Sequence, residues 1–321
     1  MTKALSHMVD CLVIGGGPAG WTAAIYLARF HLSVMVVDSG QSRLSGVPLT
    51  RNHAGYPEGI GGAELLARMR AQAEQYGAIL LEGEVGSVER KGEIFGAEIG
   101  DDRLTARSVL IATGVVNRRP AMMTDTLHDA ALAAGLLRYC PICDAYEVTD
   151  KRIAVLGSGA RAGREAEFLR GYSAQVTLIS SDGTNGITPE QLSGLVDAGV
   201  TLLAGPPLGY KICGDQLELL LPSGRFGFAT VYPALGSDVR SEIASMLGAN
   251  LSKEGCILVD AHQRTSVPGL YAAGDVVLGL DQISHAMGGG GVAATTIRND
   301  LAALRPTRRS LPSLTKDIRS S

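Results

Sequence analysis

The chain has 321 residues, of which 45% are hydrophobic, 19% charged and 5% aromatic, and its formal net charge is -3. This composition predicts a globular protein long enough for two domains, and it excludes the basic field that would collect nucleic acid or an anionic membrane. The only basic run lies near Arg305, Arg308 and Arg309, and the segment MTKALSHMVD lacks the apolar region of a signal peptide. No stretch approaches the ~20 apolar residues of a membrane span. We therefore expect a cytoplasmic protein with no nucleic-acid or membrane partner.

Residues 11–40, CLVIGGGPAGWTAAIYLARFHLSVMVVDSG, predict a strand, a glycine turn, a helix rich in alanine and leucine, and a second strand that ends at Asp38. The turn is GxGxxG, in which the glycines allow a tight turn, a close approach of backbone to a pyrophosphate, and close helix–strand packing. The pyrophosphate is expected at the helix N-terminus, and Asp38 is placed to bind a ribose hydroxyl. The expected dinucleotide-binding residues here are Gly15, Gly17, Pro18, Ala19, Gly20 and Asp38.

A second copy of this pattern occupies residues 151–183, KRIAVLGSGARAGREAEFLRGYSAQVTLISSDG. Its turn has Gly157 and Gly159, with Ala162 in the third position, and these three residues are candidates for a second nucleotide site. Two such units in one chain are the layout of a flavoprotein that takes hydride from a nicotinamide. The position that matches Asp38 is Ser180, so the second unit has neither the expected carboxylate nor an arginine for a 2′-phosphate.

Two further strand ends consist of small residues, which let backbone pass close to a ligand. The segment RSVLIATGV ends at Ala112, Thr113 and Gly114, and the segment VPGLYAAGDVVLG contains Gly274 and Asp275. Asp275 is placed to accept a hydrogen bond from a ligand hydroxyl. The segment that follows, DQISHAMGGGGVAATTIRNDL, predicts a helix whose first turn could face a bound ring.

The stretch RYCPICDAYE holds a CxxC pair, Cys140 and Cys143, which could bind a metal or transfer electrons. A structural zinc needs four ligands, and the chain has neither a second CxxC nor a histidine pair at ligand spacing; the nearest histidine, His128, stands alone. We therefore expect no metal. A CxxC at the start of a helix instead suits thiol–disulfide exchange, because the helix end lowers a thiol pKa and the spacing allows an intramolecular disulfide.

Taken in this order, GGGPAG, IATG, CPICD, GSGARA and AAGD resemble the low-molecular-weight thioredoxin reductase family, as does the stretch GYPEGIGGAELLARMRAQAEQYGA. The resemblance implies an α/β fold with two Rossmann-like dinucleotide-binding domains, the second inserted into the first. It also implies a discontinuous FAD domain at residues 1–116 and 247–321. Residues 117–246 would form the inserted NAD(P)-binding-like domain with the CxxC pair, in a homodimer.

The resemblance implies an enzyme, an FAD-dependent thiol–disulfide oxidoreductase that passes electrons from a donor through FAD to the cysteine pair. The pair would reduce thioredoxin or another disulfide substrate, with Asp144 exchanging a proton. Which cysteine attacks the substrate stays open. By the same resemblance, FAD contacts would also come from Asn52, Gln282 and Ile283, in addition to the residues named above.

Departures from the family pattern leave the electron donor open. NADPH-dependent members carry a histidine and paired arginines after the second strand, where this chain has Ile179, Ser180 and Ser181. NADPH, NADH and ferredoxin remain alternative donors, and the reverse flow of a small-molecule dithiol oxidase or a non-catalytic flavin-binding sensor are alternative functions. The role of His285 also stays open. Tyr146 could pack on the flavin or fill the domain core, and we expect it to fill the core.

Overall fold

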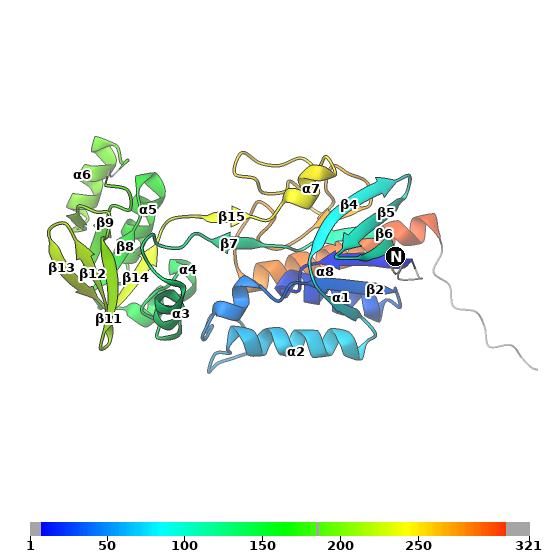
Figure 1. Cartoon of the computed structure of the whole chain (residues 1–321), viewed down its shortest axis with the longest axis horizontal. Coiled ribbons are helices and arrows are strands. Elements are labelled where there is room, and N and C mark those ends of the chain that lie inside the picture. The colour runs from blue at the N-terminus through cyan, green and yellow to red at the C-terminus, as the bar shows by residue number, and fades with distance from the viewer. Residues whose placement is uncertain (1–7, 184–185, 306–321) are drawn as a thin grey trace, which may run out of the picture.

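The computed structural model describes residues 8–183 and 186–305, which form two lobes joined by two strands (Figure 1). The first lobe contains a sheet of strand order β3-β2-β1-β6-β5-β4, with β16 beside β6. Its strands are β1 (Val9–Ile14), β2 (Val34–Asp38), β3 (Ile79–Glu82), β4 (Val85–Lys91), β5 (Ile94–Ile99), β6 (Asp102–Ile111) and β16 (Leu270–Ala272). Its helices are α1 (Pro18–Arg29), the 3-10 helix η1 (Arg43–Gly46), α2 (Gly62–Gln75), α7 (Glu242–Met246) and α8 (Ile283–Leu304).

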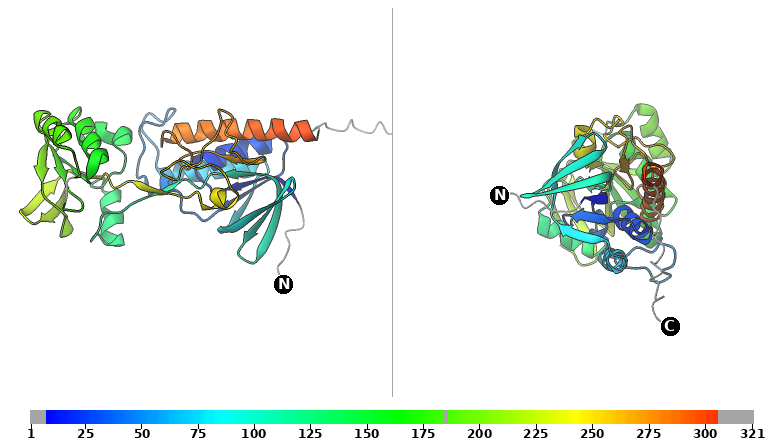
Figure 2. Two further views of the ribbon diagram at one scale, coloured as in Figure 1. Left: turned by 90° about the horizontal axis from the view of Figure 1, so that it is seen from above. Right: turned by 90° about the vertical axis from the view of Figure 1, so that its right-hand side faces the viewer.

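Strand β1 is buried on both faces, as its apolar sequence predicts for a parallel strand in the middle of a sheet. Cys11 and Val13 pack into the core formed with the helices α1, α2 and α8. Leu12 and Ile14 pack into a second core on the other face, with side chains of β4, β5 and α7. Figure 2 shows α8 running along one side of this sheet. Across residues 8–183 and 186–305, no helix is long and apolar enough to cross a membrane.

The inserted lobe has a four-stranded parallel sheet of order β10-β9-β8-β14 and a three-stranded antiparallel sheet β11-β12-β13. The parallel strands are β8 (Ile153–Leu156), β9 (Val176–Ile179), β10 (Thr201–Leu203) and β14 (Thr230–Pro233), and the antiparallel strands are β11 (Gly209–Cys213), β12 (Gln216–Leu221) and β13 (Gly224–Phe228). Its helices are α3 (Asp125–Ala133), α4 (Pro141–Asp144), the 3-10 helix η2 (Ala145–Val148), α5 (Gly159–Arg170) and α6 (Pro189–Asp197). The predicted α/β fold with an inserted dinucleotide-binding unit is confirmed.

The two lobes are connected by β7 (Val115–Asn117) and β15 (Ser237–Val239), which pair antiparallel with Ser237 opposite Asn117. After β15 the chain is already part of the first lobe, because Ala244 of α7 is fully buried in the core beneath β4 and β5. We therefore propose that the inserted domain ends at β15 rather than near residue 247. An apolar α7 side chain provides the physical reason, since it needs the first lobe for its burial.

Packing of α8 on α1 requires a glycine at position 290, where a Cβ atom would lie 2.3 Å from the carbonyl oxygen of Ala19. At Gly288, in the same helix, a Cβ atom would meet nothing within 4 Å. We expect Gly290→Ala to lower the free energy of unfolding by about 1–3 kcal/mol, because the two helices must move apart. Gly288→Ala should be neutral or stabilising by up to ~1 kcal/mol, since alanine favours helix. Equal denaturation midpoints for the two variants would contradict this account.

Candidate active site

The first glycine turn, between β1 and α1, brings backbone segments unusually close. Gly15 has a φ of 107°, and a Cβ atom there would lie 2.4 Å from the carbonyl oxygen of Ala112. A Cβ atom on Gly20 would lie 2.0 Å from the carbonyl oxygen of Gly15. Helix α1 begins after Gly17, and no described side chain caps its free N–H groups. The turn therefore offers backbone donors to an anion at the start of α1.

The predicted ribose-binding acid lies over this turn. Asp38 is the last residue of β2, and its Oδ1 accepts a hydrogen bond of 3.0 Å from the backbone N–H of Gly16. Gly16 is the middle residue of the Gly15–Gly17 turn. The carboxylate of Asp38 is thereby held beside the start of α1, where a dinucleotide would place a ribose.

The other predicted strand ends meet at the same edge of the sheet. Ile111, at the end of β6, is in register with Ile14 of β1 and with Ala272 of β16. The segments that follow these strands, which contain the glycine turn, Ala112–Gly114 and Gly274–Asp275, therefore lie together at the carboxyl edge. The Thr113 hydroxyl is already engaged at this edge, because its Oγ1 donates a hydrogen bond to the carbonyl oxygen of Arg240.

Asp275 has a cationic partner that sequence reasoning missed. The Nη1 atom of Arg43, in η1, lies 3.2 Å from Asp275 Oδ2 and 3.1 Å from Asp281 Oδ2. Burial raises the pKa of Asp275, the neighbouring Asp281 raises it further, and Arg43 opposes both effects. Arg43 is separated from these acids by more than 230 residues, so no local pattern could have paired them.

Cys140 and Cys143 form a disulfide, and it lies where the two lobes meet. Gln282, which precedes α8, donates from Nε2 to Cys143 Sγ at 3.2 Å and to Cys140 Sγ at 3.5 Å. Its Oε1 accepts a hydrogen bond of 3.1 Å from Asn52 Nδ2. The structure thus brings together the cysteine pair and two residues predicted to bind FAD. Ile283, the third of that set, is the first residue of α8 and packs against the core of the first lobe.

Asp144 is held by two side chains that the sequence pattern did not indicate. Its Oδ2 lies 2.8 Å from Arg138 Nη1, and its Oδ1 accepts a hydrogen bond of 2.9 Å from the hydroxyl of Tyr232. Burial raises the pKa of Asp144, whereas the charge of Arg138 and the hydrogen bonds from Arg138 and Tyr232 lower it. An acid whose pKa is raised by burial and whose orientation is fixed on both oxygens is suited to transfer protons next to a dithiol.

The prediction that Tyr146 fills the domain core is wrong, since its side chain is 81% exposed. Tyr146 lies in the single 3-10 turn η2, where residues three apart share a face. Ala145 and Val148 take the buried face, which turns Tyr146 outward. Ile142, between the two cysteines, is also 60% exposed, so an apolar surface borders the CxxC pair.

The histidines near the site differ in environment. His285, in the first turn of α8, is exposed. Of the basic run noted in the sequence, Arg308 and Arg309 lie outside the described residues. His128 is buried, and its ring nitrogens lie 2.9 Å from Tyr139 Oη and 2.9 Å from Asp129 Oδ1. Among residues 8–183 and 186–305, no three His, Cys, Asp or Glu side chains gather as metal ligands would.

The second glycine turn follows β8 and leads into α5. Gly159 has a φ of 71°, and a Cβ atom on Gly157 would lie 2.9 Å from the carbonyl oxygen of Ala234. Ala162, in the third position of the pattern, is fully buried against this turn. The Cβ atom added to Gly157 would also lie 2.9 Å from the Cβ atom of Ala162. The turn is therefore built like the first one, with alanine in place of the third glycine.

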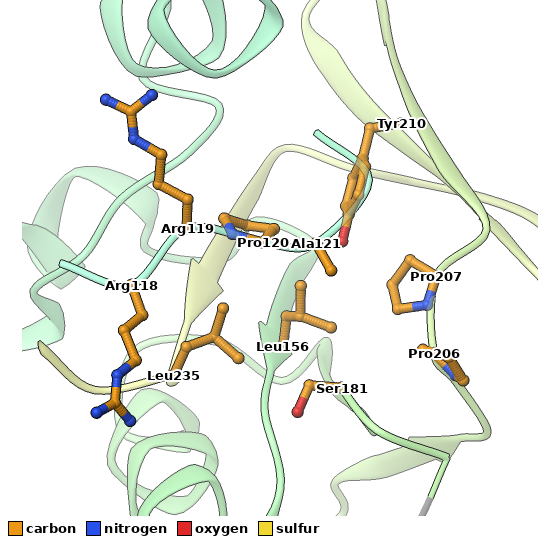
Figure 3. Close-up of a pocket in the computed structure, with 10 residues that line it drawn as sticks. All are labelled: Arg118, Arg119, Pro120, Ala121, Leu156, Ser181, Pro206, Pro207, Tyr210 and Leu235. Carbon is orange, nitrogen blue, oxygen red and sulfur yellow. The ribbon is translucent and has the colours of Figure 1, made fainter. Parts of the chain in front are cut away.

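A pocket of about 250 Å³ opens at the carboxyl edge of the same sheet. It lies beside the ends of β8 and β14, and its lining includes Leu156, Ser181 and Leu235. Figure 3 shows Arg118 and Arg119 pointing in opposite directions on one side of it. Strand order changes direction between β8 and β14, which is where open α/β sheets bind ligands.

Comparison with known proteins agrees with this geometry. Residues 9–290 match the family model described as pyridine nucleotide-disulphide oxidoreductase. The chain belongs to that family. A thioredoxin reductase of Mycolicibacterium smegmatis is 31% identical over 300 residues, which cover 89% of this chain and 94% of that protein. A thioredoxin reductase of Streptomyces coelicolor is 31% identical over 328 residues, covering 97% and 99% of the two chains.

Solved structures share the fold of this chain. The thioredoxin reductase of Streptococcus pyogenes gives a TM-score of 0.85 at 27% identity, with 92% of this chain and 99% of that chain covered. The structure of HlmI gives a TM-score of 0.86 at 29% identity, with 94% and 95% covered. With its CxxC pair, the chain is an oxidoreductase of the low-molecular-weight thioredoxin reductase group, as its motifs predicted.

Proposed function

We propose that the protein is an FAD-dependent thiol–disulfide oxidoreductase that carries electrons between FAD and the Cys140–Cys143 disulfide and passes them on to thioredoxin. The observation that supports this best is the contact of Gln282 with both sulfur atoms. This contact places the disulfide next to the start of α8, which belongs to the lobe that carries the first glycine turn. Relatives that are named thioredoxin reductase and cover nearly the whole chain support thioredoxin as the substrate.

FAD fits the residues of the first lobe. The glycine turn offers the backbone N–H groups at the start of α1 to a pyrophosphate, because no described side chain caps them, and the Gly16 N–H holds Asp38 beside this turn. The buried Nδ1 of His53, next to Asn52, has no hydrogen-bond partner among the described residues. When bound, FAD supplies a two-electron carrier. We propose that it is held by Gly15, Gly17, Pro18, Ala19, Gly20, Asp38, Asn52, Ala112, Thr113, Gly114, Gly274, Asp275, Gln282 and Ile283.

The chemistry of the cysteine pair follows from thiol–disulfide exchange. Reduction of the Cys140–Cys143 bond takes two electrons and two protons and yields two thiols, with Asp144 transferring one proton. One of the two thiols then loses its proton, and the resulting thiolate attacks the substrate disulfide, which forms a mixed disulfide and releases a substrate thiolate that takes up a proton. The second cysteine then attacks the sulfur atom of the first cysteine in the mixed disulfide. This step restores the Cys140–Cys143 bond and releases the second substrate thiol. Substrate is reduced by two electrons in each cycle.

We infer that the two lobes take up a second arrangement during turnover. The thioredoxin reductase of Lactococcus lactis in the FR conformation gives a TM-score of only 0.60 with 92% of this chain covered, against 0.85 for the Streptococcus pyogenes protein. Equal coverage with a lower score is the result expected when similar lobes are differently oriented. Rotation about β7 and β15 would move the disulfide away from Gln282, toward a protein substrate, and bring the second glycine turn to FAD.

Anaerobic reduction of the purified protein tests the proposal. We expect a yellow homodimer whose flavin absorbance is bleached by dithiothreitol and restored by oxidised thioredoxin. Bleaching by dithiothreitol without recovery in thioredoxin would redirect the search to a small disulfide or to ferredoxin-linked partners. A folded, colourless protein that takes up no FAD would refute the proposal.

A further inference from the structure

The two glycine turns of this chain can be compared with each other. In the first, the carboxylate of Asp38 accepts a hydrogen bond from Gly16, the middle residue of the turn. In the second, the middle residue is Ser158, and the residue at the strand end that matches Asp38 is Ser180, which is buried. By sequence position alone, the second turn has no carboxylate.

The structure supplies a carboxylate to the second turn from Asp182, two residues after Ser180. Asp182 turns back so that its Oδ1 accepts hydrogen bonds from Ser158 Oγ at 2.7 Å and from Ser180 Oγ at 3.1 Å. The hydroxymethyl group of Ser158, which Gly16 lacks, spans the extra distance. Both glycine turns therefore have a carboxylate over their middle residue, although the two acids occupy different positions along the chain.

Neither residues 180–200 nor the two arginines that line the pocket favour a phosphate beside Asp182. Residues 180–200 contain no lysine or arginine. Arg118, at the side of the pocket, is bound by Asp238, whose Oδ1 lies 2.9 Å and 2.7 Å from its Nε and Nη2. Arg119 is paired with Asp125. Both cations that line the pocket thus already have a carboxylate partner, and neither is matched to a 2′-phosphate.

We propose that Asp182 makes the second turn selective for a nicotinamide dinucleotide without a 2′-phosphate, so that NADH and not NADPH is the donor. This inference rests on the proposed function, because it names the donor of the same electron-transfer chain. A ribose 2′-hydroxyl donates a hydrogen bond to a carboxylate, whereas a 2′-phosphate in its place meets like charge. Ser158 and Ser180 act as positioning residues, since they hold the carboxylate over the turn.

Two measurements on the FAD-loaded protein test the inference. Calorimetric titration with ADP-ribose and with 2′-phospho-ADP-ribose reports on the turn without any flavin chemistry, and anaerobic bleaching compares NADH with NADPH. We expect ADP-ribose to bind at least about tenfold tighter, and NADH to bleach the flavin faster by a similar factor. Asp182→Asn, which keeps the size but removes the charge, should bring both ratios close to one. Glu190→Gln, an exposed acid at the start of α6, is the matched control and should leave both ratios unchanged.

The possible outcomes separate this inference from the proposed function. Equal or tighter binding of 2′-phospho-ADP-ribose by the unchanged protein overturns it, and so does an Asp182→Asn variant with an unaltered ratio. Ser158→Ala provides a second variant, which should also reduce the ratio because the carboxylate loses its 2.7 Å anchor. If neither nucleotide binds while dithiothreitol still bleaches the flavin, the donor inference fails and the dithiol chemistry stands.

Discussion

A Cys143→Ser variant will keep FAD but lose turnover of thioredoxin by at least roughly a thousandfold, because the exchange reaction loses one of its two sulfur atoms. The unchanged protein has three free cysteines beside the disulfide. Under denaturing conditions it should therefore show three thiols before reduction and all five of its cysteines after reduction. The variant should show the same number of thiols in both states.

Cys213→Ser is the matched control for this prediction. Cys213 is a free, exposed cysteine at the end of β11, outside the site. Its replacement should leave turnover within about twofold, since exposed substitutions away from a site rarely matter. Undiminished turnover in Cys143→Ser would remove the cysteine pair from the mechanism. Trapping of a mixed disulfide in either Cys140→Ser or Cys143→Ser will show which cysteine attacks the substrate.

The second large effect is expected at Asp144. Asp144→Asn should lower turnover by roughly 10²–10⁴-fold, the range typical for loss of a positioned acid or base. It should also remove one limb of the pH–rate profile. If Asp144 acts as an acid toward a sulfur atom, turnover falls as pH rises through its pKa. If it acts as a base, turnover rises with pH there.

The neighbours of Asp144 provide a test that a purely structural role would not pass. Burial raises the pKa of Asp144, and Arg138 and Tyr232 lower it. Arg138→Gln and Tyr232→Phe each remove a lowering influence, so the limb should move to higher pH in both variants. Arg225→Gln, which breaks an exposed ion pair with Glu218 in the same lobe, should leave the limb in place. A limb that stays fixed in Arg138→Gln would mean that Asp144 is not the titrating group.

Local patterns in the sequence were sufficient for the two glycine turns and for the CxxC pair followed by an acid, whereas the insertion of one unit into the other was implied by the family resemblance. The turns and the CxxC pair depend on short-range requirements. Gly15 is needed where φ is positive and a carbonyl group lies close, and Cys140 and Cys143 are close enough in sequence to form a disulfide in any fold that starts a helix there.

The contacts that tune the site were decided only by tertiary structure. Tyr232 reaches Asp144 across 88 residues, and Gln282 reaches Cys143 across 139. Neither pair leaves a trace in local periodicity, because strand β14 and helix α8 must first be packed before these side chains meet. Asp182 shows the same limit at short range, since residue counting placed Ser180 in the acid's position and only the path of the chain after β9 returns a carboxylate to the turn.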